Sequence, residues 1–122
     1  MNENSQFIHK DLPVYYFANA ADFHDWLSTN YTRDQAFWLR VYKKASSKPT
    51  VKMTDAVDEA LCYGWIDGLA NALDDESYLV RFTHRRPKSV WSKINVAKVE
   101  KLIAEGRMQP SGQVHVDTAK AD

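Results

Sequence analysis

The chain has 122 residues, 44% of them hydrophobic and 26% charged, which predicts one soluble domain with a single core. Its 16 basic residues balance 16 acidic ones, which excludes bulk attraction to nucleic acid or anionic membranes, and its single cysteine excludes an internal disulfide. No apolar run has the length of a signal peptide or a membrane span, so we expect a cytoplasmic protein without membrane insertion.

The N-terminal part of the chain predicts a strand followed by a helix. Residues 1–11 are polar and are expected to form a flexible N-terminus. The aromatic and β-branched run Pro13–Phe17 is typical of a short strand. Asn19 is a suitable N-cap for a helix over residues 20–29, in which an acidic residue of the first turn suits the helix dipole.

Residues 36–42 form a second predicted strand, which has aromatic side chains on both faces. Such a strand is expected at the centre of a sheet, or where its second face is partly covered. The polar segment 43–49 ends in proline and is interpreted as a loop. Thr54 is a predicted N-cap for the next helix, and Gly64 is placed to end that helix in the left-handed conformation.

The following residues predict a hairpin and a further helix. Trp65–Leu73 and Tyr78–Thr83 alternate as strands do, on either side of an acidic turn. Ser89 or Ser92 is expected to cap a helix that runs to about Glu105.

Beyond this helix, Gln109–Gly112 is predicted to be a turn, and residues 114–122 a short helix or a frayed end. Together these elements predict an α+β fold with two layers, in which helices pack on a mainly antiparallel sheet of about four strands. We expect a single domain over residues 12–119.

The charge reverses sharply in the middle of the chain. Residues 53–80 hold acidic side chains and no Lys or Arg, whereas residues 81–99 hold basic side chains and no acid. In the basic stretch, a loop leads into a helix start, where backbone N–H groups and serine hydroxyls favour an anion. This pattern predicts a site for a small anionic ligand or an acidic protein segment, built from Arg85, Arg86, Lys88, Ser89, Ser92 and Lys93, with Trp65 and Trp91 as walls.

An alternative is that these basic residues only neutralise the acidic stretch, with Trp91 in the core. One basic stretch on a neutral domain is a small electrostatic footprint, which argues against nucleic acid as the ligand. Asp67 also has two interpretations. It contacts a ligand in the space beside Gly68, or it forms a structural ion pair with Arg81 on the returning strand.

Signatures of catalysis and metal binding are weak. Cys62 lies at a predicted helix C-terminus, where the dipole disfavours a thiolate, so a structural role is favoured. Asp58 and Glu59 are adjacent on a helix and point apart, which favours a solvated face over an acid–base pair. No metal or other cofactor is expected, because no metal-ligand spacing joins the histidines, which are His9, His24, His84 and His115.

Residues 59–68, EALCYGWIDG, resemble the EALCFGWIDG signature of the YdeI/OmpD-associated proteins. A second signature of that family is similar to RFT at 81–83, RRPKS at 85–89 and WSKIN at 91–95. The resemblance extends over roughly Tyr15–Ala119. It implies a small α+β core like that of the YjbR and DUF1801 proteins, and a role in protection against bacteriocins or in envelope stress.

This chain departs from the family pattern in two places. His84 stands where the resemblance implies proline, so the basic loop is expected to be less rigid. The sequence ends at Asp122, where relatives continue into a longer C-terminal tail, so any function of that tail is expected to be missing.

The residues and the resemblance leave three functional hypotheses. The favoured one is a non-enzymatic binding module for an anionic ligand. The second is a small enzyme with Cys62 or Asp67 as the reactive group and His84 as the proton carrier. The third is a protein–protein interaction domain in which Trp38 and Tyr42 cover a partner surface. No oligomeric state is predicted.

Overall fold

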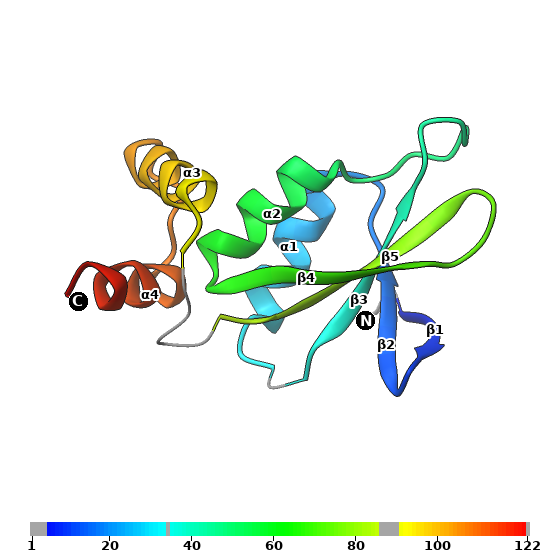
Figure 1. Ribbon diagram of the computed structural model, residues 1–122, viewed down its shortest axis with the longest axis horizontal. Helices are drawn as coiled ribbons and strands as arrows, with labels where there is room; N and C mark the ends of the chain where they lie inside the picture. Colours follow the sequence, from blue (N-terminus) through cyan, green and yellow to red (C-terminus); the bar gives the residue numbers. More distant parts are fainter. Residues whose placement is uncertain (1–4, 34, 86–90, 122) are drawn as a thin grey trace.

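The computed structural model describes residues 5–33, 35–85 and 91–121 (Figure 1). In chain order the elements are β1 (Ser5–His9), β2 (Leu12–Tyr16), α1 (Ala20–Asn30), β3 (Phe37–Tyr42), α2 (Met53–Cys62), β4 (Trp65–Ala72), β5 (Ser77–His84), α3 (Lys93–Ala104) and α4 (Pro110–Ala121). The strands form one sheet in the order β1-β2-β3-β5-β4. The predicted α+β fold class is confirmed, with five strands in place of about four.

The sheet is mixed. β2 and β3 are parallel, whereas β1–β2, β3–β5 and β4–β5 are antiparallel pairs. A parallel pair needs a crossover, and α1 supplies it between β2 and β3. β3 lies at the centre of the sheet, as the aromatic residues on both of its faces predicted.

One face of the sheet is covered by α1 and α2 (Figure 1). The largest core lies between them and the strands, where Phe23 of α1 packs edge-on against Phe37 and Phe82 with ring centres 6.2 and 5.8 Å apart. α3 and α4 lie beside α2, beyond the end of the sheet, and bury Val99, Leu102 and Val116. No helix within the described ranges is long and apolar enough to cross a bilayer.

The second face of the sheet carries a smaller core, in which Trp38 is covered by the β1–β2 hairpin. The indole Nε1 donates to the His9 carbonyl at 3.0 Å, and the His9 ring packs edge-on against it. Trp38 and Tyr42 are only 2% and 8% exposed. The hypothesis that these two residues cover a partner surface is therefore wrong.

Two of the predicted N-caps are confirmed, because each side chain accepts a hydrogen bond from a backbone N–H in the first turn of its helix. Asn19 Oδ1 accepts a hydrogen bond from the N–H of Asp22, and Ser92 Oγ accepts one from the N–H of Asn95. Thr54 is not a cap, because the N-cap position of α2 is held by Lys52, which makes no side-chain hydrogen bond there.

Two segments have more regular structure than predicted. Residues 5–9, expected to be flexible, form β1 and pair with β2. Residues 109–112, predicted to be a turn, contain the start of α4, whose first residue is Pro110. Proline suits this position because its fixed φ fits a helix and its missing N–H would have no partner within the helix.

Candidate functional site

The candidate site lies where α2 ends and α4 begins. Gly64 ends α2 with a φ of +85°, as predicted, and turns the chain into β4. The start of α4 satisfies the last carbonyls of α2: the N–H of Gln109 donates to Cys62 at 3.0 Å, and the Ser111 hydroxyl donates to Tyr63 at 2.9 Å. The positive end of one helix therefore faces the negative end of the other.

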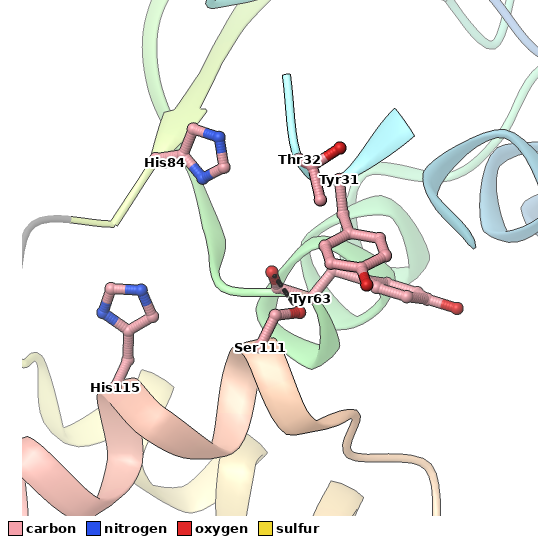
Figure 2. A pocket seen from close by; sticks show the side chains of 6 residues that line it. All are labelled: Tyr31, Thr32, Tyr63, His84, Ser111 and His115. Carbon is pink, nitrogen blue, oxygen red and sulfur yellow. Dashed lines mark hydrogen bonds between the residues drawn. The ribbon is translucent and has the colours of Figure 1, made fainter. Parts of the chain in front are cut away.

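An open cleft of about 540 Å³ lies beside this junction. Figure 2 shows two imidazoles on one side and two phenol rings on the other, with a serine between them. The lining residues are Tyr31, Thr32, Tyr63, His84, Ser111 and His115. A smaller cavity of about 260 Å³ shares Tyr31, Tyr63 and Ser111 with the cleft and extends it towards Ser28 and Gln109.

His84 is held on two sides. Its ring lies over Trp65, its cross-strand neighbour, with the ring centres 4.1 Å apart. Its Nε2 contacts the carbonyl oxygen of Arg33. A carbonyl oxygen can only accept, so Nε2 carries the proton. Trp65 is completely buried and packs against the His84 ring. The prediction that Trp65 forms a wall of the ligand site is therefore wrong.

His115 is the second imidazole of the cleft, and it lies against Gly64, where an added Cβ would be 2.9 Å from its ring. Burial lowers the pKa of His115, and the positive charges of Arg85 and His84 lower it further. Arg85 is 5% exposed, and its guanidinium lies 3.6 Å from the centre of the Trp91 ring. Cationic groups from β5, α4 and the end of the hairpin thus gather around one cleft.

Behind Tyr63 lies a buried carboxylate. Glu59 is 9% exposed and is contacted by the Arg107 guanidinium and the His24 imidazole, each at 2.8 Å. Burial raises the pKa of Tyr63, and the Glu59 charge raises it further, so the phenol stays protonated. Asp58 points away and pairs with Lys98 at 2.8 Å. The two acids diverge as predicted, but the expectation of a solvated face is wrong for Glu59.

The described residues of the predicted anion site do not line the cleft. Arg86, Lys88 and Ser89 lie outside the described residues. Trp91 is half-buried and packs against the core, where it contacts Arg85. The remaining two, Ser92 and Lys93, are exposed, and the Ser92 oxygen is engaged in capping α3. Among the described residues of this set, Arg85 acts on the cleft through its charge on His115.

The predicted ion pair between Asp67 and Arg81 is wrong. Asp67 lies opposite Phe82 in the β4–β5 ladder and shares its face of the sheet. Arg81 follows the alternation of β5 and projects from the other face, with Leu79. Among the described residues no ion pair joins the two, and neither lines the cleft.

Cys62 is structural, as its position predicted. It is 1% exposed, and burial together with the nearby Glu59 raises the pKa of its thiol to about 12. A thiolate nucleophile is therefore not formed at neutral pH. Within the described ranges, no group of three His, Cys, Asp or Glu residues could hold a metal ion.

Most of the cleft is not predicted by any local pattern. Tyr31 and Tyr63 each stand at the end of a helix, and Ser111 and His115 belong to a helix whose start was interpreted as a turn. One local signal was present: a serine directly after Pro110 is typical of a helix N-terminus. The other cleft residues come together only through the packing of α4 on α2, which no local sequence pattern predicts.

A family model described as a domain of unknown function (DUF8412) matches residues 15–115 of the chain. The matched segment contains every residue that lines the cleft, from Tyr31 to His115. No curated protein and no solved structure matches the chain. The geometry of the cleft is therefore the basis on which its function is inferred.

Proposed function

The chain belongs to the family described as a domain of unknown function (DUF8412), and we propose a function for it from the geometry of the cleft. The protein binds a small anionic ligand in the cleft and does not catalyse a reaction. One observation carries this proposal. His84 and His115 line the cleft, the described residues of its wall include no acidic side chain, and the charge of Arg85 acts on His115. A bound carboxylate or phosphate would offset this positive charge.

Neutral donors support the same ligand class. Tyr31, Thr32 and Tyr63 also belong to the cleft wall, and the Tyr63 phenol is protonated and can donate a hydrogen bond. A volume of about 540 Å³ suits a small molecule better than an acidic protein segment. The ligand would be oriented by imidazoles on one side and by phenols on the other.

An enzyme has less support than a binding module. The Ser111 hydroxyl donates to a backbone carbonyl, and Cys62 is buried with a raised pKa, so neither is an activated nucleophile. Among the described residues no hydrogen bond joins His84 to Asp67, the other reactive pair considered.

We place this binding function in the cytoplasm and in bacteriocin tolerance. The location is supported by the free thiol of Cys62. The physiological role is supported only by the resemblance of residues 59–68 to the YdeI/OmpD-associated signature. Neither the proposed location nor the proposed physiological role depends on the geometry of the cleft.

Ligand-induced thermal shifts test the binding proposal. Acetate, benzoate and phosphate are titrated at about pH 6 and at constant ionic strength set with chloride, so that the histidines are partly protonated. We expect at least one of these anions to raise the Tm. His115→Gln should weaken that anion about tenfold, because a charge-assisted hydrogen bond is lost.

His9→Gln is the matched control, since His9 packs on Trp38 at the second face of the sheet and does not line the cleft. It should keep the affinity of the parent protein. If no anion exceeds chloride, or if His115→Gln binds as the parent does, the cleft is not an anion site.

A further inference from the structure

A second hollow lies at the other end of α2. It measures about 860 Å³ and is formed by the end of β3, the segment 43–52, the start of α2, and Tyr78 of β5. In Figure 1 this segment is the loop that leads from β3 to the first turn of α2. Among the described residues, its wall contains four lysines, Lys43, Lys44, Lys48 and Lys52, and no acidic side chain. We call this hollow the lysine groove.

The backbone that presents these lysines is fixed by hydrogen bonds. The N–H of Lys43 donates to the Glu76 carbonyl at 2.8 Å, and the N–H of Val51 donates to the Phe17 carbonyl at 3.1 Å. Between them, the Thr50 hydroxyl accepts from the N–H of Tyr42 at 3.1 Å. The segment is thus tied to the residue after β2, to β3 and to the β4–β5 turn, so the backbone positions that carry the lysines are set before a ligand arrives.

The groove concentrates positive charge that the fold does not neutralise. Lys48 pairs with Glu76 at 3.3 Å, but Lys43, Lys44 and Lys52 are exposed and form no ion pair within the described ranges. Lys52 also occupies the N-cap of α2, where the helix dipole disfavours a cation. On a chain of zero net charge, this arrangement gives a local positive potential.

We propose that the lysine groove is a second binding site, which takes a small ligand with two or more linked phosphate groups. Lysines bind phosphate as separate point charges, so several of them around one hollow favour several linked phosphates over one compact anion. The volume also exceeds that needed by a single phosphate and suits a ligand of nucleotide size. Tyr78, which is partly exposed, lines the same groove and offers a ring surface beside the charges.

Calorimetric titration with inorganic tripolyphosphate tests this site. At about pH 8 histidines are neutral and lysines charged, so the cleft contributes little and the groove remains active. The variant Lys44→Ala/Lys52→Ala should bind tripolyphosphate about tenfold more weakly. Lys93→Ala/Lys101→Ala on α3 is the control, because it removes the same charge from two exposed lysines outside the groove, and it should bind as the parent does.

Folding is checked on the ligand-free proteins by circular dichroism. Removing a cation from the N-cap of α2 relieves repulsion, so the groove variant should melt at or above the temperature of the parent. Lys44→Glu, which leaves α2 unchanged, is a second variant and should also lose tripolyphosphate binding.

Two further ligands define the class. ATP bound as tightly as tripolyphosphate shows that the phosphates alone are recognised, and tighter binding shows that the nucleoside adds contacts; both results support the proposal. Equal binding by the parent and both groove variants would overturn it. So would an equal loss in the control, or a single-stranded oligonucleotide that binds the groove more tightly than either small anion, since nucleic acid would then be the ligand.

Discussion

Gly112 lets α4 lie directly on the end of α2. A Cβ at this position would be 2.3 Å from the carbonyl oxygen of Cys62 and 2.6 Å from that of Leu61, both of them backbone atoms. Alanine normally stabilises a helix relative to glycine by about 1 kcal/mol. At Gly112 we expect alanine to be destabilising instead, because the clash would force the two packed helices apart.

We therefore expect Gly112→Ala to lower the free energy of unfolding by about 2 kcal/mol or more, as measured by urea denaturation. Gly68→Ala is the matched control, because its nearest atom would be the Arg81 carbonyl oxygen at an ordinary 3.7 Å. That variant should stay within about 0.5 kcal/mol of the parent. Equal stability of the two variants would show that α4 does not pack on α2 as described.

Cys62 makes a second prediction at the scale of one residue. Its thiol is buried and its pKa is raised to about 12, so the reactive thiolate is absent at neutral and mildly alkaline pH. A thiol reagent such as 5,5′-dithiobis(2-nitrobenzoate) should leave the native protein unlabelled and react with one thiol per chain in guanidinium chloride. Labelling of the native protein at the rate of a free thiol would restore the enzyme hypothesis that uses Cys62.

At the scale of elements, Glu59 joins three parts of the chain. Its carboxylate, on α2, contacts the imidazole of His24 in α1 and the guanidinium of Arg107 in the link between α3 and α4. Its side chain is 11% exposed, whereas those of His24 and Arg107 are 43% and 40% exposed. The carboxylate is therefore buried, whereas its two partners are well solvated. Solvent screening weakens each ion pair, but the buried carboxylate still needs both partners to offset the cost of its desolvation.

Glu59→Gln keeps the shape of the side chain and removes its charge. We expect it to lower the free energy of unfolding by about 1–2 kcal/mol, because the Arg107 guanidinium loses its anionic partner. Asp58→Asn removes a charge one residue away, from a pair with Lys98 that is about a quarter exposed, and should cost less, about 0.5 kcal/mol. Urea unfolding of both variants makes the comparison, and a larger loss for Asp58→Asn would contradict the central place of Glu59.

The elements that could be predicted are those whose signals are local. Asn19, Ser92 and Gly64 act on residues within one helical turn, and the β4–β5 hairpin alternates in its own sequence. β1 is only five residues long, follows a polar start of the chain, and forms a strand through pairing with β2. The cleft could not be predicted for the same reason, since Tyr31 and His115 meet only through the packing of α4 on α2.

At the scale of the whole molecule, the lowered pKa of His115 makes stability depend on pH. In the unfolded chain this histidine titrates near 6.5, whereas in the folded protein it titrates at a lower pH. Below pH 6.5 the unfolded state therefore binds more protons, so the contribution of His115 to stability falls as the pH falls through that window. His115→Gln should flatten this part of the profile, measured as the free energy of unfolding between about pH 7 and pH 5.

The two proposed sites lie at opposite ends of α2, and their binding should depend on pH in different ways. An anion in the cleft offsets the charges of Arg85 and His84 and so raises the pKa of His115, which couples binding to proton uptake. Binding in the cleft should tighten from about pH 8 to pH 6, with a measured heat that changes with the ionisation enthalpy of the buffer. The described wall of the lysine groove contains no histidine, so binding of tripolyphosphate there should not require an imidazole to take up a proton. A cleft ligand whose affinity is the same at both pH values would show that the imidazoles do not hold it, even if the groove binds as proposed.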